Sequence, residues 1–191
     1  MIAKQTTATL SILFLSFHLV NAQAINQTKI DAKGYEMLLG KIDKKGLTQD
    51  AYATWFNGQY ESYEVDTKII KSIKNELKKN KITLFMATWC GDSKREVPRF
   101  YKILEAANYP MDQLTVVALD YEKNQYKKSP GGEEKGLNII KVPTMIFYKD
   151  GTAVNRIVES PIESLEKDIK AIVKGKDYVP NYGDVPMLPV D

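Results

Sequence analysis

Apolar residues recur every three or four positions in four stretches of the chain, the spacing of one face of an amphipathic helix. These stretches are residues 48–63, 66–80, 90–108 and 161–175. Thr48 and Asp66 stand where N-caps are expected, and Pro98 falls inside the third stretch, where it favours a kink. A shorter helix is predicted at residues 35–42. The five aromatic side chains of the first stretch are expected to pack on the core.

Strands are predicted where the apolar pattern changes. Residues 81–87 and 114–120 are short apolar runs without polar alternation, which is typical of strands covered on both faces. Residues 144–149 and 153–158 flank a turn at Lys149-Asp150-Gly151 and predict a hairpin. The order of elements predicts an α/β fold with a central mixed sheet and helices on both of its faces.

Length and charge limit the classes of protein that fit. The 191 residues suggest one domain with some additions, and 43% hydrophobic residues are enough for a core. The net charge of +3 is too balanced to suggest nucleic acid as a partner.

The N-terminus has the pattern of a secretory signal peptide. Lys4 precedes the apolar run Leu10–Val20, and small or aliphatic residues end at Ala22. The run is well short of the roughly 18–20 residues that cross a bilayer. We therefore expect residues 1–22 to be removed, and the mature protein to be extracytoplasmic, either periplasmic or secreted, with no membrane anchor.

Signal cleavage would remove His18, the sole histidine, and leave Cys90 as the sole thiol. Catalytic Cys/His and Ser/His pairs and the usual histidine-containing zinc sites are then excluded, so neither a metal nor a cofactor is expected. A single cysteine in an exported protein fits either an intermolecular disulfide or a reactive free thiol.

The surroundings of that cysteine resemble the Trp-Cys-x-x-Cys active site of the thioredoxin superfamily, with serine in place of the final cysteine. The motif consists of Trp89, Cys90, Gly91, Asp92 and Ser93. Two further matches are Pro98, eight residues after the cysteine, and a tripeptide that opens the hairpin. That tripeptide is Val142, Pro143 and Thr144.

The resemblance covers roughly residues 66–175 and implies a thioredoxin-like domain there. Residues 23–65 are then an N-terminal helical extension, and residues 176–191 are an extended C-terminal tail. The resemblance also implies that Pro143 is cis and lies beside Cys90, where the backbone of Val142 can pair with an extended substrate.

A thiol at a helix N-terminus faces unpaired N–H groups and the positive end of the helix dipole, which favour the thiolate. Ser93 either directs its hydroxyl at the sulfur or is an ordinary polar residue of a first helical turn. Asp92 opposes the thiolate, while Lys94 and Arg95 favour it, and solvent makes each of these effects small.

Two departures from the family argue against a dithiol reductase. Ser93 cannot resolve a mixed disulfide, and Leu84 stands where reductases of the family carry a buried acid. We therefore expect a monothiol thiol-disulfide oxidoreductase. Cys90 would attack protein disulfides or a low-molecular-weight thiol adduct, and an external thiol would complete the reaction.

Two alternatives stay open at this point. The first is a redox-inactive binding or chaperone module that captures extended polypeptide in the groove beside Pro143. The second follows from the Cys-Gly-x-Ser pattern, which resembles monothiol glutaredoxins that hold an iron–sulfur cluster. Trp89 and the signal peptide argue against that cluster.

Overall fold

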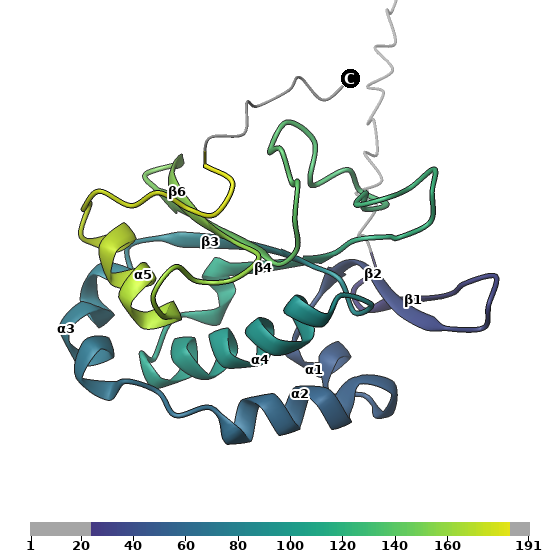
Figure 1. The fold of residues 1–191 in the computed structure, drawn as a ribbon, viewed down its shortest axis with the longest axis horizontal. Coiled ribbons are helices and arrows are strands. Elements are labelled where there is room, and N and C mark those ends of the chain that lie inside the picture. Colours follow the sequence, from purple (N-terminus) through teal and green to yellow (C-terminus); the bar gives the residue numbers. More distant parts are fainter. Residues whose placement is uncertain (1–23, 184–191) are drawn as a thin grey trace, which may run out of the picture.

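A computed structural model describes residues 24–183 of the chain as a six-stranded sheet with five α-helices (Figure 1). The strands are β1 (Gln27–Ile30), β2 (Glu36–Ile42), β3 (Lys81–Met86), β4 (Leu114–Ala118), β5 (Thr144–Lys149) and β6 (Thr152–Val158). The helices are α1 (Lys44–Leu47), α2 (Asp50–Ser62), α3 (Thr67–Leu77), α4 (Gly91–Ala106) and α5 (Leu165–Val173), with a 3₁₀ turn at Met111–Gln113. In this part of the chain, no helix is long and apolar enough to cross a membrane.

The sheet is mixed, as the element order predicts. Its strand order is β1-β2-β4-β3-β5-β6, in which β3 and β4 are parallel and every other neighbouring pair is antiparallel. The antiparallel β5–β6 pair is the predicted hairpin, and its turn includes Gly151 with a φ of +81°. β3 lies between β4 and β5, so the chain that leaves β3 emerges in the middle of the sheet.

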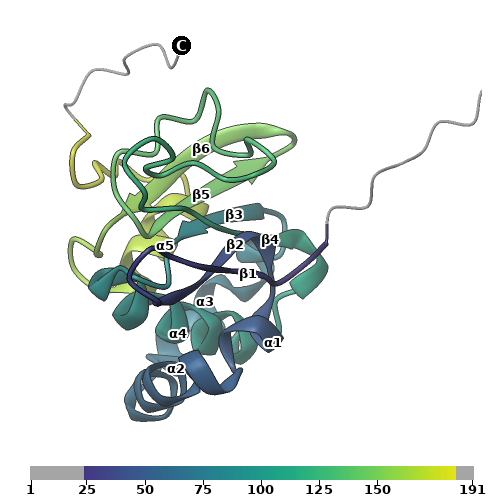
Figure 2. The ribbon, with the colours of Figure 1, turned by 90° about the vertical axis from the view of Figure 1, so that its right-hand side faces the viewer.

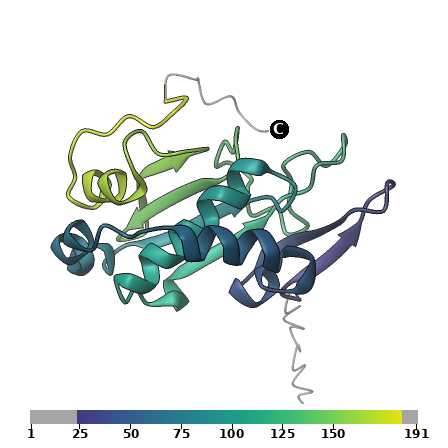
Figure 3. The ribbon, with the colours of Figure 1, turned by 60° about the horizontal axis from the view of Figure 1, so that its bottom comes forward.

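The helices all pack on one face of the sheet (Figures 1 and 3). That face presents Leu84, Met86 and Phe147 to the main core, which also receives apolar side chains from α1 to α5. The opposite face carries Phe85, Val117 and other side chains of a smaller cluster. A central mixed sheet flanked by helices is confirmed, but the expected placing of helices on both faces is wrong.

The second face is covered by the long segment between β4 and β5, which lies on the side of the sheet away from the helices (Figure 1). Ile139 and Val142 of this segment are buried against the sheet, and Leu137 packs beside them. Residues 119–143 contain turns but neither helix nor strand. Two neighbouring glycines and a proline, Pro130 to Gly132, interrupt any helical pattern there.

The N-terminal segment differs from its prediction. Residues 36–42 form strand β2 rather than a helix, so the extension at 23–65 is only partly helical. Four of the β2 residues are buried in succession, because the strand pairs with β1 on one side and β4 on the other. Figure 2, viewed from the β1–β2 end, shows this hairpin continuing the sheet. The prediction of a helix at residues 35–42 was wrong because a short apolar run does not distinguish a helix from a strand.

Side-chain caps fix where α3 and α5 begin. Asp66 accepts a hydrogen bond from the Ile69 amide at 2.9 Å, which confirms it as the cap of α3. Ser164 accepts from the Lys167 amide at 3.2 Å, so α5 begins at Leu165 and not at the predicted Pro161. Thr48 follows α1 rather than capping α2, which starts at Asp50.

Helix α2 is part of the core and not an appendage. Phe56 is 1% exposed and packs edge-on against Tyr101 of α4, with 5.8 Å between the ring centroids. Tyr60 donates a hydrogen bond to Glu105 of α4, and Lys44 pairs with the same carboxylate at 2.6 Å. The aromatic residues of this helix therefore have the packing role that their spacing predicts.

Phe56→Ala is expected to lower the free energy of unfolding by about 3–5 kcal/mol, because it leaves a cavity between α2 and α4. Tyr35→Ala is the matched control, since Tyr35 is 70% exposed, and we expect a change within about 0.5 kcal/mol. Urea unfolding of both variants measures the difference. Equal stabilities would show that α2 does not belong to the core.

Candidate active site

Cys90 lies at the junction between β3 and α4, where it is the N-cap residue of the helix. Its amide donates to the Ala87 carbonyl at 3.1 Å, and its own carbonyl accepts from the Lys94 amide at 3.0 Å. The side chain is half-buried and packs against the smaller cluster. The thiol thus stands at the positive end of a 16-residue helix with part of its surface open to solvent.

The thiol contacts the loop that contains the cis-proline. Cys90 Sγ donates a hydrogen bond to the Val142 carbonyl oxygen at 3.2 Å. The Val142–Pro143 peptide bond is cis, as the resemblance implies. Thr144 Oγ1 donates to the Lys141 carbonyl at 2.7 Å and closes this loop. Cys90 and Val142 meet because β3 and β5 are neighbours in the sheet.

Ser93 has a structural role that differs from the predicted contact with the sulfur. Its side chain is fully buried, and its Oγ accepts a hydrogen bond from the Ala87 amide at 3.2 Å. That amide is the first after β3, so the serine ties the end of the strand to the first turn of α4. Within residues 24–183, the Cys90 sulfur bonds to the Val142 carbonyl, whereas the Ser93 hydroxyl bonds to the Ala87 amide.

Trp89 forms an aromatic wall beside the thiol. Its indole Nε1 donates to the Leu119 carbonyl at 2.9 Å, just beyond the end of β4. Its ring lies 6.0 Å from that of Tyr121 and 5.9 Å from that of Tyr126, measured between centroids. Tyr126 is half exposed, so this wall extends from the thiol to the surface.

Asp92 of the motif and two charged residues that follow it, Arg95 and Glu96, form ion pairs. Arg95 pairs with Asp92 at 2.8 Å and with the buried Glu96 at 2.6 Å. The hydrogen bond to Glu96 is the main cause of the raised pKa of Arg95, to which Asp92 adds. Arg95 is therefore engaged by two carboxylates, which agrees with the small effect expected of it at the thiol.

Two other residues of the predicted site, Gly91 and Pro98, and the leucine at the position of the family's buried acid have the following surroundings. A β-carbon on Gly91 would meet nothing within 4 Å, so the backbone there is open on the outer side of the turn. Pro98 is buried inside α4, which continues across it. Leu84 is fully buried in the main core and offers no proton to the site.

The β1–β2 hairpin braces the active-site edge of the sheet, a role that sequence reasoning missed. Lys29 pairs with Asp120, which follows β4, at 2.8 Å. Asp31 accepts a hydrogen bond from the Tyr121 hydroxyl. The Leu38 amide of β2 donates to Thr88 Oγ1 at 3.3 Å, directly before Trp89. The hairpin therefore holds the segment on which Trp89 rests.

This hydrogen bonding changes the pKa values of the groups involved. The Tyr121 hydroxyl is the main cause of the lowered pKa of Asp31, and Asp31 in turn raises the pKa of Tyr121 to about 12. The bond to Asp120 is the main cause of the raised pKa of Lys29. No group of three or more metal-ligating side chains gathers within residues 24–183.

Comparisons with known proteins agree with this fold. Residues 63–171 match the family model described as thioredoxin. A thioredoxin of Mycolicibacterium smegmatis is 36% identical over 74 residues, which are 39% of this chain and 60% of the relative. Mitochondrial thioredoxin-3 of Saccharomyces cerevisiae is 31% identical over 113 residues, which are 57% of this chain and 81% of the relative.

The crystal structure of that yeast protein in its oxidised form covers 59% of this chain and 97% of its own, at 28% identity and a TM-score of 0.34. The sequence matches, rather than this low score, define the class of protein. The chain belongs to the thioredoxin family. It spans about three fifths of the length of the mycobacterial relative.

Tyr121→Phe is expected to lower the free energy of unfolding most between about pH 4 and pH 10, and the difference from wild type should shrink toward both ends of the pH range. Asp31 has a lowered pKa when folded, so its contribution to stability is complete above the unfolded pKa of about 3.9 and is lost as the pH falls through the folded value. Tyr121 has a raised pKa, so its contribution is lost as the pH rises from about 10 through about 12. The variant should lack both of these pH-dependent contributions to the free energy of unfolding.

Urea unfolding of wild type and variant from pH 2 to 12 measures these components. Tyr35→Phe is the control, because Tyr35 is exposed. Parallel stability profiles for wild type and Tyr121→Phe would show that the Asp31–Tyr121 bond does not contribute.

Proposed function

We propose that this protein is an exported monothiol thiol-disulfide oxidoreductase in which Cys90 is the nucleophile. The observation that carries the proposal is the position of its half-exposed sulfur, at the N-terminus of α4 and 3.2 Å from the carbonyl of the residue before a cis-proline. Family membership supports thiol-disulfide chemistry in general. A mechanism with one thiol is proposed because serine stands at position 93 and the sequence contains one cysteine.

The contact with Val142 links client binding to activation of the thiol. In the resting protein the Cys90 S–H donates to the Val142 carbonyl. An extended client that donates a backbone N–H to the same carbonyl would replace this bond. The thiol would then be free to lose its proton to solvent, and the helix N-terminus would favour the resulting anion.

The exchange itself balances in two steps. The Cys90 thiolate attacks one sulfur of a client disulfide, the client S–S bond breaks, and the second client sulfur leaves as a thiolate. A thiolate from another molecule then attacks the mixed disulfide and releases Cys90. Client protein thiols and disulfides are the proposed partners, and a low-molecular-weight thiol is the proposed resolving group. The two steps only exchange disulfide bonds between sulfur atoms, so no further oxidant or reductant is needed.

A pocket of about 410 Å³ beside the aromatic wall would suit client side chains next to the disulfide. Tyr126 and Ile139 line it, and the second of these belongs to the same apolar cluster as the thiol. Apolar client residues could therefore be buried there while the client backbone pairs with Val142.

Cys90→Ala and Ser93→Cys form the pair of variants that tests the mechanism. Wild-type protein mixed with a peptide disulfide should form a covalent adduct that persists until a small thiol is added. Ser93→Cys should release the peptide without an added thiol, because the new sulfur can attack the adduct and close an internal disulfide. Cys90→Ala should form no adduct. Intact-protein mass spectrometry distinguishes these species.

The contrary outcomes are equally distinct. If wild type forms no adduct while Cys90→Ala still binds the peptide with unchanged affinity, the protein is the redox-inactive binding module and not an oxidoreductase. If Ser93→Cys releases the peptide no faster than wild type, residue 93 does not have access to the reacting sulfur.

Export is the second part of the proposal, and it rests on residues 1–22, which lie outside the described residues. An oxidising compartment would supply disulfide-bonded clients. N-terminal sequencing of protein from its native host should begin after Ala22. A chain that retains residues 1–22 in the cytosolic fraction would contradict this.

A further inference from the structure

The Val142 carbonyl, which accepts the hydrogen bond from the thiol, lies between two carbonyls that other residues hold. The Lys141 carbonyl accepts from Thr144 Oγ1 at 2.7 Å. The Pro143 carbonyl accepts from the Glu159 amide, also at 2.7 Å. These two bonds hold the peptide groups on either side of Val142, so together they set where its own carbonyl oxygen points.

Glu159 adopts an unusual backbone conformation directly after β6. Its φ is +64°, in the left-handed region that residues other than glycine rarely adopt. Glycine would have this conformation at a lower cost in free energy, and the glutamate side chain makes contacts that offset the difference. Tyr182 donates to one carboxylate oxygen at 2.5 Å, and Lys141 donates to the other at 3.1 Å. The carboxylate thus bridges the C-terminal segment and the residue before Val142.

The bridge of Lys141, Glu159 and Tyr182 is compact. The Lys141 ammonium also lies 5.1 Å from the centroid of the Tyr182 ring. The bond from Tyr182 is the main cause of the lowered pKa of Glu159, and the bond to Glu159 is the main cause of the raised pKa of Lys141. The side chains of Lys141 and Glu159 are 40% and 25% exposed, so solvent weakens their attraction. The bridge therefore holds a geometry rather than adding much stability.

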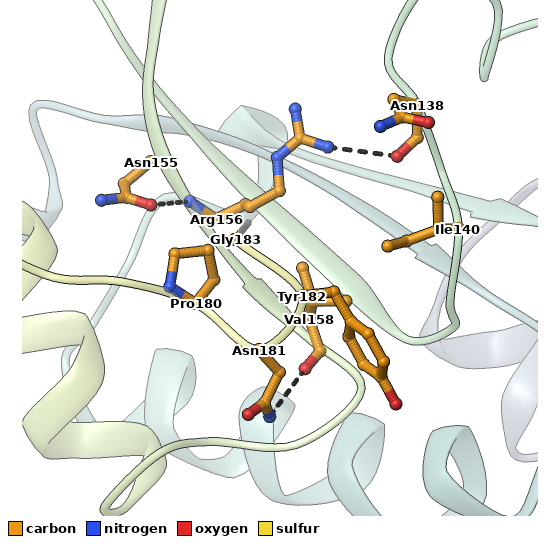
Figure 4. Close-up of a pocket in the computed structure, with 9 residues that line it drawn as sticks. All are labelled: Asn138, Ile140, Asn155, Arg156, Val158, Pro180, Asn181, Tyr182 and Gly183. Atoms are coloured by element: carbon orange, nitrogen blue, oxygen red, sulfur yellow. Dashed lines mark hydrogen bonds between the residues drawn. The ribbon is translucent and has the colours of Figure 1, made fainter. Parts of the chain in front are cut away.

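The C-terminal segment that carries Tyr182 is fastened to the edge of the sheet. Figure 4 shows the Asn181 amide bonded to the Val158 carbonyl at the end of β6, with Tyr182 next to it. Asn155 of β6 donates to the Tyr178 carbonyl at 2.9 Å. Tyr182 thus approaches Glu159 from a segment that is anchored at two points of the same strand.

We propose that Glu159 is a positioning residue for client binding, because its amide and its bridged carboxylate hold Pro143 and Lys141 and so keep the Val142 carbonyl in place for an extended client. The inference deepens the proposed function and rests on its pairing of client backbone with Val142. Glu159 acts through the loop and not by contact with the reacting sulfur. Tyr182 of the C-terminal segment contributes to client affinity by the same route.

Glu159→Gln tests the proposal in the reaction with an uncharged peptide disulfide. Mass spectrometry follows adduct formation at increasing peptide concentration and gives a maximal rate and a half-saturating concentration. The half-saturating concentration should rise about two- to tenfold, the effect expected for one hydrogen bond. The maximal rate should stay within about twofold of wild type. A variant that only folded less well would lower the maximal rate instead, because fewer molecules would be active.

Two more variants separate geometry from charge. Lys141→Gln removes a positive charge and Glu159→Gln a negative one, so an effect of charge alone would have opposite signs in the two proteins. Loss of the bridge raises the half-saturating concentration in both. Tyr182→Phe changes no charge and should also raise it, and this variant decides the matter if Glu159→Gln does not fold. Glu163→Gln is the matched control, since it breaks an exposed Lys–Glu pair of 3.0 Å before α5.

The same substitutions in a Cys90→Ala background separate this inference from the redox function. Peptide affinity in that background requires no chemistry, and each bridge variant should bind the peptide about two- to tenfold more weakly than Cys90→Ala alone. If wild type forms no adduct, the redox function fails, and these affinities alone decide the role of Glu159.

Four results would overturn the proposal. The first is an equal half-saturating concentration in wild type and Glu159→Gln, and the second is a change of opposite sign in Glu159→Gln and Lys141→Gln. The third is equal peptide affinity of all proteins in the Cys90→Ala background. The last is the absence of both adduct formation and peptide binding, because no client would then pair with Val142.

Discussion

The adjacency of β3 and β5 is the constraint on which the rest of the site depends. Because these strands pair, the chain leaving β3 and the chain entering β5 meet at one edge of the sheet. Cys90 and Val142, 52 positions apart, come within one hydrogen bond of each other as a result. The fully buried Ser93 then fixes how α4 departs from that edge.

Much of this arrangement was predictable from the sequence because its signals are local. The apolar run before Trp89, the cap at Asp66 and the turn at Gly151 each depend on a few neighbouring residues. The cis bond at Pro143 was expected only from the resemblance, since no local pattern around it requires that geometry. The position of Ser93 in the first turn was predicted, but its partner was not. Whether the Ser93 hydroxyl bonds to the Cys90 sulfur or to a backbone amide depends on how closely β3 approaches α4.

The N-terminal segment shows where sequence reasoning fails. The pattern of residues 35–42 suits a helix as well as a strand, and only pairing with β4 decides between them. Lys29 and Asp31 reach partners about ninety positions away, which no periodicity reveals. The surface pocket lined by Asn138, Arg156 and Asn181 was unpredictable for the same reason, because its walls come from three separate stretches of the chain.

The one-sided placement of the helices has a consequence for motion. Backbone amide hydrogens that are bonded within helices and strands exchange slowly with solvent. Segments held mainly by turns open at a smaller cost in free energy. The face that bears the thiol is covered by such a segment, residues 119–143, while the opposite face is sealed by α1 to α5. Local opening on the thiol-bearing face should therefore cost less free energy than separating the sheet from its helices.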